Sequence, residues 1–183
     1  AMLFSAGIFG SVFLVSQYLQ IGMGFGPLES GLRAAPWTMV PMVVAPVAGV
    51  LVKRYGPRAV LLIGMVLQTA AVGCFVLLAH TSSGYGPYVL PMLIAGTGMG
   101  LTFSPLATAV LEGIASQDRA IVSGVNQTAR QLGTATGIAL CTALFTTFGT
   151  YAPGERFTAG LVPALGACTV LLVAATALVI AMP

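Results

Sequence analysis

Hydrophobic residues in this chain fall into six long runs separated by short polar connections. A helix needs about 20 mostly apolar residues to cross the hydrocarbon core of a bilayer, and every run is long enough. The pattern predicts membrane-spanning helices near residues 2–22, 32–52, 58–79, 87–111, 120–148 and 158–182. Because short connections place consecutive spans side by side, the expected fold is an all-α membrane protein, a six-helix transmembrane bundle with no soluble domain.

The composition agrees with a membrane protein. Charged residues make up 6% of the chain and hydrophobic residues 57%, with a mean hydropathy of +1.00, whereas soluble domains carry roughly a quarter charged residues. The net charge is +3, but the basic residues are scattered between apolar runs and cannot form the continuous positive surface that nucleic acids bind. We therefore predict a lipid bilayer as the surroundings and no nucleic-acid partner.

The sequence lacks the residue groupings of known active sites. It has a single His and four acidic residues, and it contains no HExxH, GxSxG or Walker motif and no pair of carboxylates within a span. Its cysteines, Cys74, Cys141 and Cys168, lie in apolar runs without metal-ligand spacing and are expected to be buried free thiols. We predict that the protein is not an enzyme and has no metal and no cofactor.

Basic residues indicate how the chain is threaded through the membrane. The second connection, KRYGPR (53–58), holds three of them, and Arg119 flanks the connection that lies on the same side of the predicted bundle. Arg33 and Arg156 lie on the opposite side. Since cytoplasmic loops carry an excess of Lys and Arg, the KRYGPR loop is expected to face the cytoplasm.

The fifth run carries polar residues along one face. At about 100° per residue, Asn126, Gln127, Arg130 and Thr134 share a stripe of that helix. Arg130 lies about 15 Å along it, near the middle of a hydrocarbon core about 30 Å thick, where a charge costs at least about 2.5 kcal/mol. It is expected to face the bundle interior or a wet cavity, either as a structural residue that donates to carbonyls of neighbouring helices or as part of a transport pathway.

A smaller polar face is expected on the first run. Phe13, Gln17 and Gln20 are spaced to share one side of that helix, which predicts either a cavity wall or polar contacts that hold helices together.

Pairs of glycines four residues apart predict close helix contacts, because small residues let two backbones approach. The chain has such pairs in its fourth run, at Gly96 and Gly100, and in its fifth run, at Gly133 and Gly137.

Five stretches, in order, resemble one family. They are YLQ, GPLESGLRAAPWT, APVAGVLVKRYGPR, GTGMGLTFSP and SGVNQTARQLGTATGIAL, and together they resemble the C-terminal six-helix half of major facilitator superfamily transporters, most of all the fourteen-helix drug:proton antiporters of the EmrB/QacA type. The likeness covers nearly the whole chain. It implies that residues 1–183 are one half of a larger transporter, that the N-terminal half of the same protein is the partner, and that the location is a bacterial inner (plasma) membrane.

The cytoplasmic loop motif of the family, GxLxDRxGxR, is similar to GVLVKRYGPR, where Gly49, Arg54, Gly56 and Arg58 match. The family associates this loop with switching between inward-open and outward-open states. Lys53 replaces the aspartate, so any ion pair of that aspartate is lost here, and we expect the loop to serve topology more than switching.

The resemblance implies proton-coupled efflux of amphipathic small molecules or drugs by alternating access. The acidic residues lie at or near the ends of the spans, so the proton-carrying carboxylate is expected in the other half; they are Glu29, Glu112, Asp118 and Glu155. Two alternatives stay open, a self-standing six-helix protein that forms homodimers and a membrane scaffold subunit that transports nothing. The expected substrate cavity is lined by Phe13, Gln17, Gln20, Asn126, Gln127, Arg130 and Thr134.

Overall fold

The computed structural model describes residues 1–81, 84–111, 113–152 and 154–181, and in these ranges it contains helices and no strands. The helices are α1 (Met2–Gln17), continued by the π-helical turn η1 (Tyr18–Gly22), α2 (Pro27–Tyr55), α3 (Pro57–Thr81), α4 (Gly86–Leu111), α5 (Arg119–Phe148) and α6 (Glu155–Ala181). Six segments, with α1 and η1 counted as one, are long and apolar enough to cross a membrane. The predicted all-α membrane fold is therefore confirmed.

α2 begins earlier than the hydrophobic pattern predicted. Proline is favoured in the first turn of a helix, and Pro27 occupies that turn. Glu29 lies there too, where a negative charge interacts favourably with the helix dipole, and its carboxylate accepts a hydrogen bond from Arg33 at 2.7 Å. Residues 27–31, expected to be a connection, are therefore helical.

The KRYGPR connection is also shorter than expected. α2 continues through Tyr55, and α3 starts at Pro57, so a single residue separates the two helices. That residue is Gly56, whose φ of 82° is a left-handed conformation that glycine adopts without the steric cost other residues incur.

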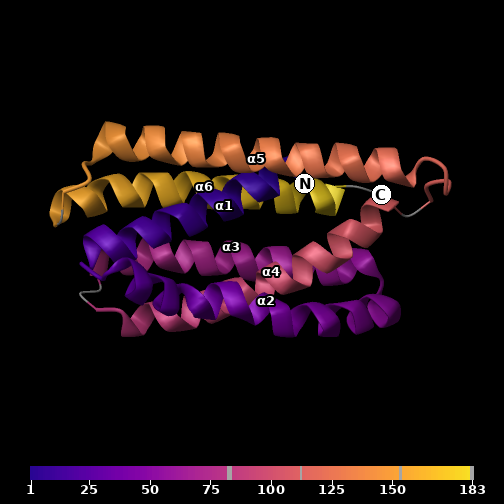
Figure 1. Ribbon diagram of the computed structural model, residues 1–183, viewed down its shortest axis with the longest axis horizontal. Helices are drawn as coiled ribbons and strands as arrows, with labels where there is room; N and C mark the ends of the chain where they lie inside the picture. The colour runs from indigo at the N-terminus through magenta and orange to yellow at the C-terminus, as the bar shows by residue number, and fades with distance from the viewer. Residues whose placement is uncertain (82–83, 112, 153, 182–183) are drawn as a thin grey trace.

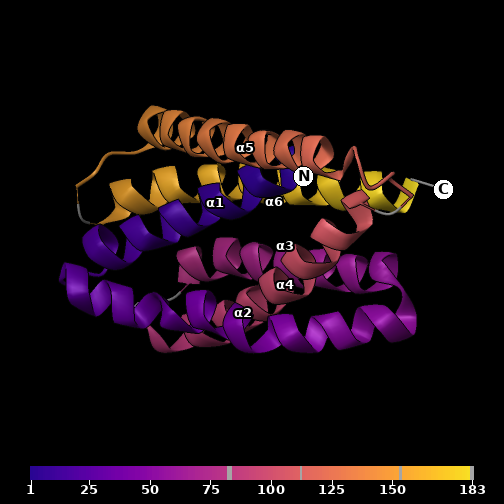
Figure 2. The same ribbon diagram turned by 45° about the vertical axis from the view of Figure 1, so that its right-hand side comes forward.

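The helices form two groups of three (Figures 1 and 2). In one group α1 packs against α5 and α6, and in the other α4 packs against α2 and α3, while α3 and α6 join the groups. If α1 is exchanged with α4, α2 with α5 and α3 with α6, this pattern of contacts is unchanged. Because α1 and α4 run in opposite directions in Figure 1, the chain has the arrangement of an inverted repeat.

Two close helix contacts hold α5 to α1 and α2 to α4. A Cβ atom on Gly133 or Gly137 of α5 would collide with the backbone of Met2 or Ala6 of α1. On α4, a Cβ atom on Gly96 would lie 2.8 Å from the Pro36 carbonyl oxygen of α2. Gly100 has the same role, since its Cβ would lie 2.8 Å from Val44 Cβ of α2.

A band of aromatic rings joins all the helices at one end of the bundle. Each ring contacts the next, with centroids 4.9–6.2 Å apart. All of these side chains are buried. The rings belong, in order of contact, to Trp37, Phe75, Tyr88, Tyr18, Phe157 and Phe145. We call this set the aromatic band.

Candidate functional site

Arg130 lies near the middle of α5 and points toward α4. Its guanidinium carbon is 4.5 Å from the centroid of the Phe103 ring, a distance at which a cation is attracted to the face of an aromatic ring. Phe103 in turn contacts Phe4 and Phe9 of α1, with centroids 6.1 Å and 6.4 Å apart. We call Phe4, Phe9 and Phe103 the aromatic platform, because together they support the charged end of Arg130.

The guanidinium of Arg130 is not fully satisfied. The side chain is half-buried, and its Nε atom is buried without a hydrogen-bond partner in the part of the chain that the structure describes. A buried N–H group without an acceptor is unfavourable, and more so on a charged group. The structural role foreseen for Arg130, hydrogen bonding to carbonyls of neighbouring helices, therefore does not account for Nε.

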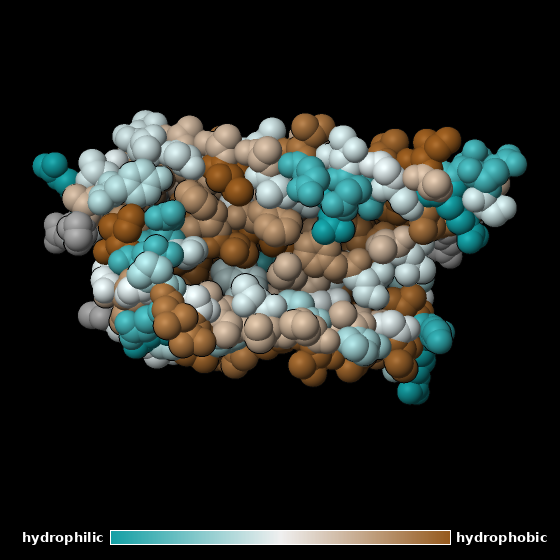
Figure 3. Space-filling view, viewed as in Figure 1, coloured by the Kyte–Doolittle hydropathy of each residue, from teal (hydrophilic) through white to brown (hydrophobic). Residues whose placement is uncertain are grey.

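The other predicted residues of α5 lie beside Arg130. Asn126 is half-buried and Gln127 is exposed, while the Thr134 hydroxyl donates to the Arg130 carbonyl oxygen at 3.0 Å. The opposite side of the helix is apolar and exposed, with Ile121 and Val125 at 67% and 65% of their full accessibility. Figure 3 shows hydrophilic atoms gathered on α5 above a largely hydrophobic front face.

The residues predicted on α1 lie far from Arg130. Met2 contacts Gly133, Ala6 contacts Gly137 and Gly10 faces Cys141, so α1 and α5 run parallel in a fixed register. That register puts Gln17 level with the end of α5, roughly 27 Å along the axis from Arg130 at 1.5 Å per residue. The expected cavity residues therefore do not form one cluster.

The expected polar face of α1 is also interrupted. Phe13 and Gln17 are half-buried, and Gln20 is exposed within the π-helical turn η1. A π turn has more residues per turn than an α-helix, so it changes the direction in which the following side chains point. Gln17 and Gln20 lie at the end of the bundle that holds the aromatic band.

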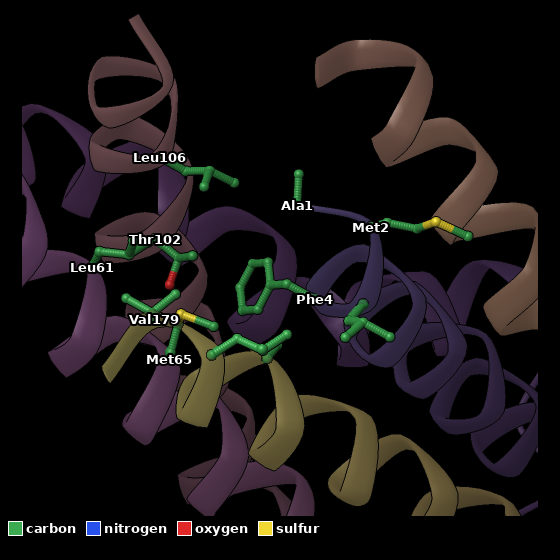
Figure 4. A pocket seen from close by; sticks show the side chains of 11 residues that line it. Ala1, Met2, Phe4, Leu61, Met65, Thr102, Leu106 and Val179 are labelled. Carbon is green, nitrogen blue, oxygen red and sulfur yellow. The ribbon is translucent and has the colours of Figure 1, made fainter. Parts of the chain in front are cut away.

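A pocket of about 250 Å³ opens beside the first turn of α1 (Figure 4), lined by side chains of α1, α3, α4 and α6. Phe4 points into it opposite Met65 and Val179. The lining side chains are apolar apart from the Thr102 hydroxyl, which donates to the Gly98 carbonyl oxygen at 2.7 Å. The described side chains of the pocket therefore offer mainly apolar contact.

Sequence reasoning missed the aromatic platform. Phe9 precedes Phe13 by four residues, so helical periodicity places the two on one side of α1, and this signal was available. The sequence contains no such signal for Phe103, because its contact with Arg130 depends on how α4 packs against α5. Gln68 of α3 was also missed, although it is fully buried and both polar atoms of its amide lack a partner among the described residues.

The loop motif lies at the opposite end of the bundle from the aromatic band. Arg54 is exposed, with its guanidinium carbon 5.4 Å from the Tyr55 ring centroid. Arg58 donates a hydrogen bond to the Ile180 carbonyl oxygen at 2.9 Å, so it satisfies a carbonyl in the last turn of α6. Gly49 is half-buried in α2. Arg58 therefore connects the start of α3 to the end of α6.

Residues 1–138 match the sequence profile of the Major Facilitator Superfamily. The chain belongs to this family. The prediction drawn from the five sequence stretches is thus confirmed at the level of the family, and the chain is a multi-pass integral membrane protein of the major facilitator superfamily.

Three bacterial proteins illustrate the similarity. The Multidrug resistance protein B homolog of Mycobacterium tuberculosis is 33% identical over 144 residues, which cover 78% of this chain and 26% of that protein. The Tetracenomycin C resistance and export protein of Streptomyces glaucescens is 30% identical over 139 residues, covering 76% and 26%. The Multidrug efflux pump LfrA of Mycolicibacterium smegmatis is 27% identical over 157 residues, covering 86% and 31%. The chain thus spans about a quarter to a third of the length of these relatives.

Proposed function

We propose that residues 1–183 form the C-terminal six-helix half of a secondary active transporter that exports amphipathic small molecules by alternating access. The observation that carries this proposal is membership of the major facilitator superfamily together with relatives named for multidrug resistance and export. Two such bundles pack around a central site in this family's architecture, and rocking of one against the other opens it to either side. In this proposal the protein is a transporter of a bacterial inner membrane and catalyses no reaction.

The exposed faces of α2 and α5 support a partner bundle. These two helices are the least buried of the six, and they flank the front face on which α1 and α4 cross (Figure 1). Lipid is an unsuitable cover for Gln127 and Arg130 of α5, because polar and charged groups in hydrocarbon are costly. We infer that the N-terminal half of the same protein covers this face and encloses Asn126, Gln127, Arg130 and Thr134.

We place the proton-carrying carboxylate in the N-terminal half of the same protein. Among the described side chains, the acidic residues are Glu29, which binds Arg33, and Asp118, which precedes α5; the side chains of Glu112 and Glu155 lie outside the described part. None of the described carboxylates lies in the middle of a span. The KRYGPR loop faces the cytoplasm in this proposal, in agreement with the excess of basic residues on its side.

The test uses the full-length parent protein in proteoliposomes. With an imposed proton gradient, we expect accumulation of a fluorescent amphipathic dye, and collapse of the gradient by an uncoupler should abolish it. Transport that is insensitive to the uncoupler would contradict proton coupling, and no transport of any amphipathic probe would favour a scaffold.

The size of the native polypeptide distinguishes half of a larger transporter from a self-standing six-helix protein that forms homodimers. An antibody against the connection between α5 and α6 should detect a membrane protein more than twice the 18.6 kDa of residues 1–183. A product close to 18.6 kDa would contradict the half-transporter proposal and favour a homodimer.

A further inference from the structure

The position of Arg130 sets it apart from the other charged residues that the structure describes. Each of the others lies in a connection or within about two turns of a helix end, while Arg130 is near the middle of α5. A guanidinium has five N–H donors and no acceptor. One of these donors, Nε–H, is buried without a partner in the described ranges.

No acidic side chain among the described residues supplies the acceptor for that donor. Glu29 is 2.7 Å from Arg33, and Asp118 lies twelve residues before Arg130, roughly 18 Å along α5. The guanidinium lies over the Phe103 ring, which attracts the positive charge but does not accept from the N–H donors in the plane of the guanidinium. A cation at this depth requires a compensating group.

The surroundings of Arg130 favour one class of compensating group. The aromatic platform offers ring faces and edges against which another aromatic ring can pack. The carboxamides of Asn126 and Gln127 lie on the same side of α5 and add N–H donors. A guanidinium fits carboxylate oxygens through paired hydrogen bonds. A cationic ligand would instead be repelled by Arg130.

We propose that Arg130 binds the anionic oxygen of an aromatic substrate, so that the substrates of this transporter include amphipathic aromatic carboxylates or phenolates. The proposal rests on the function proposed above and names the substrate class of the same face. In the bound state the anion accepts from Nε–H and from a second guanidinium N–H. The aromatic part of the substrate packs against Phe9 and Phe103, which are both half-buried and therefore reachable.

The test compares two dyes with the same xanthene core and opposite charge, the anion fluorescein and a cationic rhodamine ester. Their binding to the full-length protein in lipid nanodiscs is measured by fluorescence anisotropy. We expect the wild type to bind fluorescein more tightly than the rhodamine ester. Arg130→Gln should weaken fluorescein binding by about tenfold or more, the range of a lost charge-assisted hydrogen bond, and should leave rhodamine binding unchanged or stronger.

Two further variants serve as controls for Arg130→Gln. Arg156→Gln removes the same charge from an exposed position at the start of α6, and it should change neither affinity. Arg130→Lys keeps the charge but loses the paired donors, so fluorescein binding should fall between those of the wild type and Arg130→Gln. This variant also serves if Arg130→Gln fails to fold.

Several results would overturn the proposal. They are a preference of the wild type for the rhodamine ester, no fluorescein binding at all, or unchanged fluorescein binding in Arg130→Gln. Equal weakening of both dyes would also overturn it, because Arg130 would then act through the folded structure and not through the charge of the dye. Export is measured separately: binding of fluorescein without export of any dye contradicts the transport function and keeps the site, whereas export that Arg130→Gln leaves intact contradicts the site and keeps the function.

Discussion

Substituting Gly137 by alanine should force α1 and α5 apart. The added Cβ would lie 2.5 Å from Ala6 Cα and 2.7 Å from its carbonyl carbon, whereas carbon atoms in contact are about 3.5–4.0 Å apart. The helices must therefore separate by about 1 Å, a gap that removes a quarter to a half of the dispersion energy of the displaced contacts. Overpacking of this kind typically costs about 1–3 kcal/mol.

Gly124 of the same helix provides a matched control. It is exposed, and a Cβ added there would meet no atom within 4 Å. Alanine is favoured over glycine in a helix by about 1 kcal/mol, and both variants gain this, so their difference isolates the collision. For a difference of about 2 kcal/mol in a 183-residue bundle that unfolds as one unit, we expect Gly137→Ala to melt about 4–8 °C below Gly124→Ala.

The assay follows thermal unfolding of the full-length protein in detergent with a thiol-reactive fluorogenic dye. Cys141 and Cys168 are fully buried, so labelling of these thiols reports loss of packing between α5 and α6. A midpoint for Gly137→Ala equal to or above that of Gly124→Ala would refute the close approach of α1 and α5.

Three further predictions concern the core and the loop. Gln68→Met should raise the midpoint in the same assay, because it removes two buried polar atoms that lack partners at a cost of about 1–3 kcal/mol; a lower midpoint would show that the amide is satisfied. Arg58→Ala should accelerate amide hydrogen exchange in the last turn of α6, where its bond to Ile180 is lost, whereas Arg54→Ala should not, and equal exchange in the two variants would contradict the capping role. Lys53→Asp should leave transport rates close to wild type, and a large gain would show that the loop acts as a gate.

The number and type of the helices could be predicted because each span corresponds to its own run of apolar residues. The early start of α2 was also encoded locally, by Pro27 and Glu29, but the hydrophobic pattern outweighed those signals. The π-helical turn at Tyr18–Gly22 could not be predicted in this way. It shifts backbone hydrogen bonds in a segment where Tyr18 packs between Tyr88 and Phe157, and such packing is a property of the assembled bundle.

The candidate site was only partly predictable for the same reason. Asn126, Gln127, Arg130 and Thr134 were correctly placed on one stripe of α5, since helical periodicity fixes which residues share a face. Their relation to Gln17 required the register between two helices, which the sequence of neither helix contains. The contact between Arg130 and Phe103 depends on that packing too, so it became visible only in the folded chain.

The two close helix contacts occupy equivalent places in the inverted repeat. The contacts of α5 with α1 and of α2 with α4 are equivalent under the inverted repeat, as expected for descent from a duplicated three-helix ancestor. Yet the glycines lie on both helices in the contact of α5 with α1, where Gly10 of α1 faces Cys141, and on α4 in the contact of α2 with α4. The two halves of the repeat therefore reach equivalent helix pairings with small residues placed on different helices.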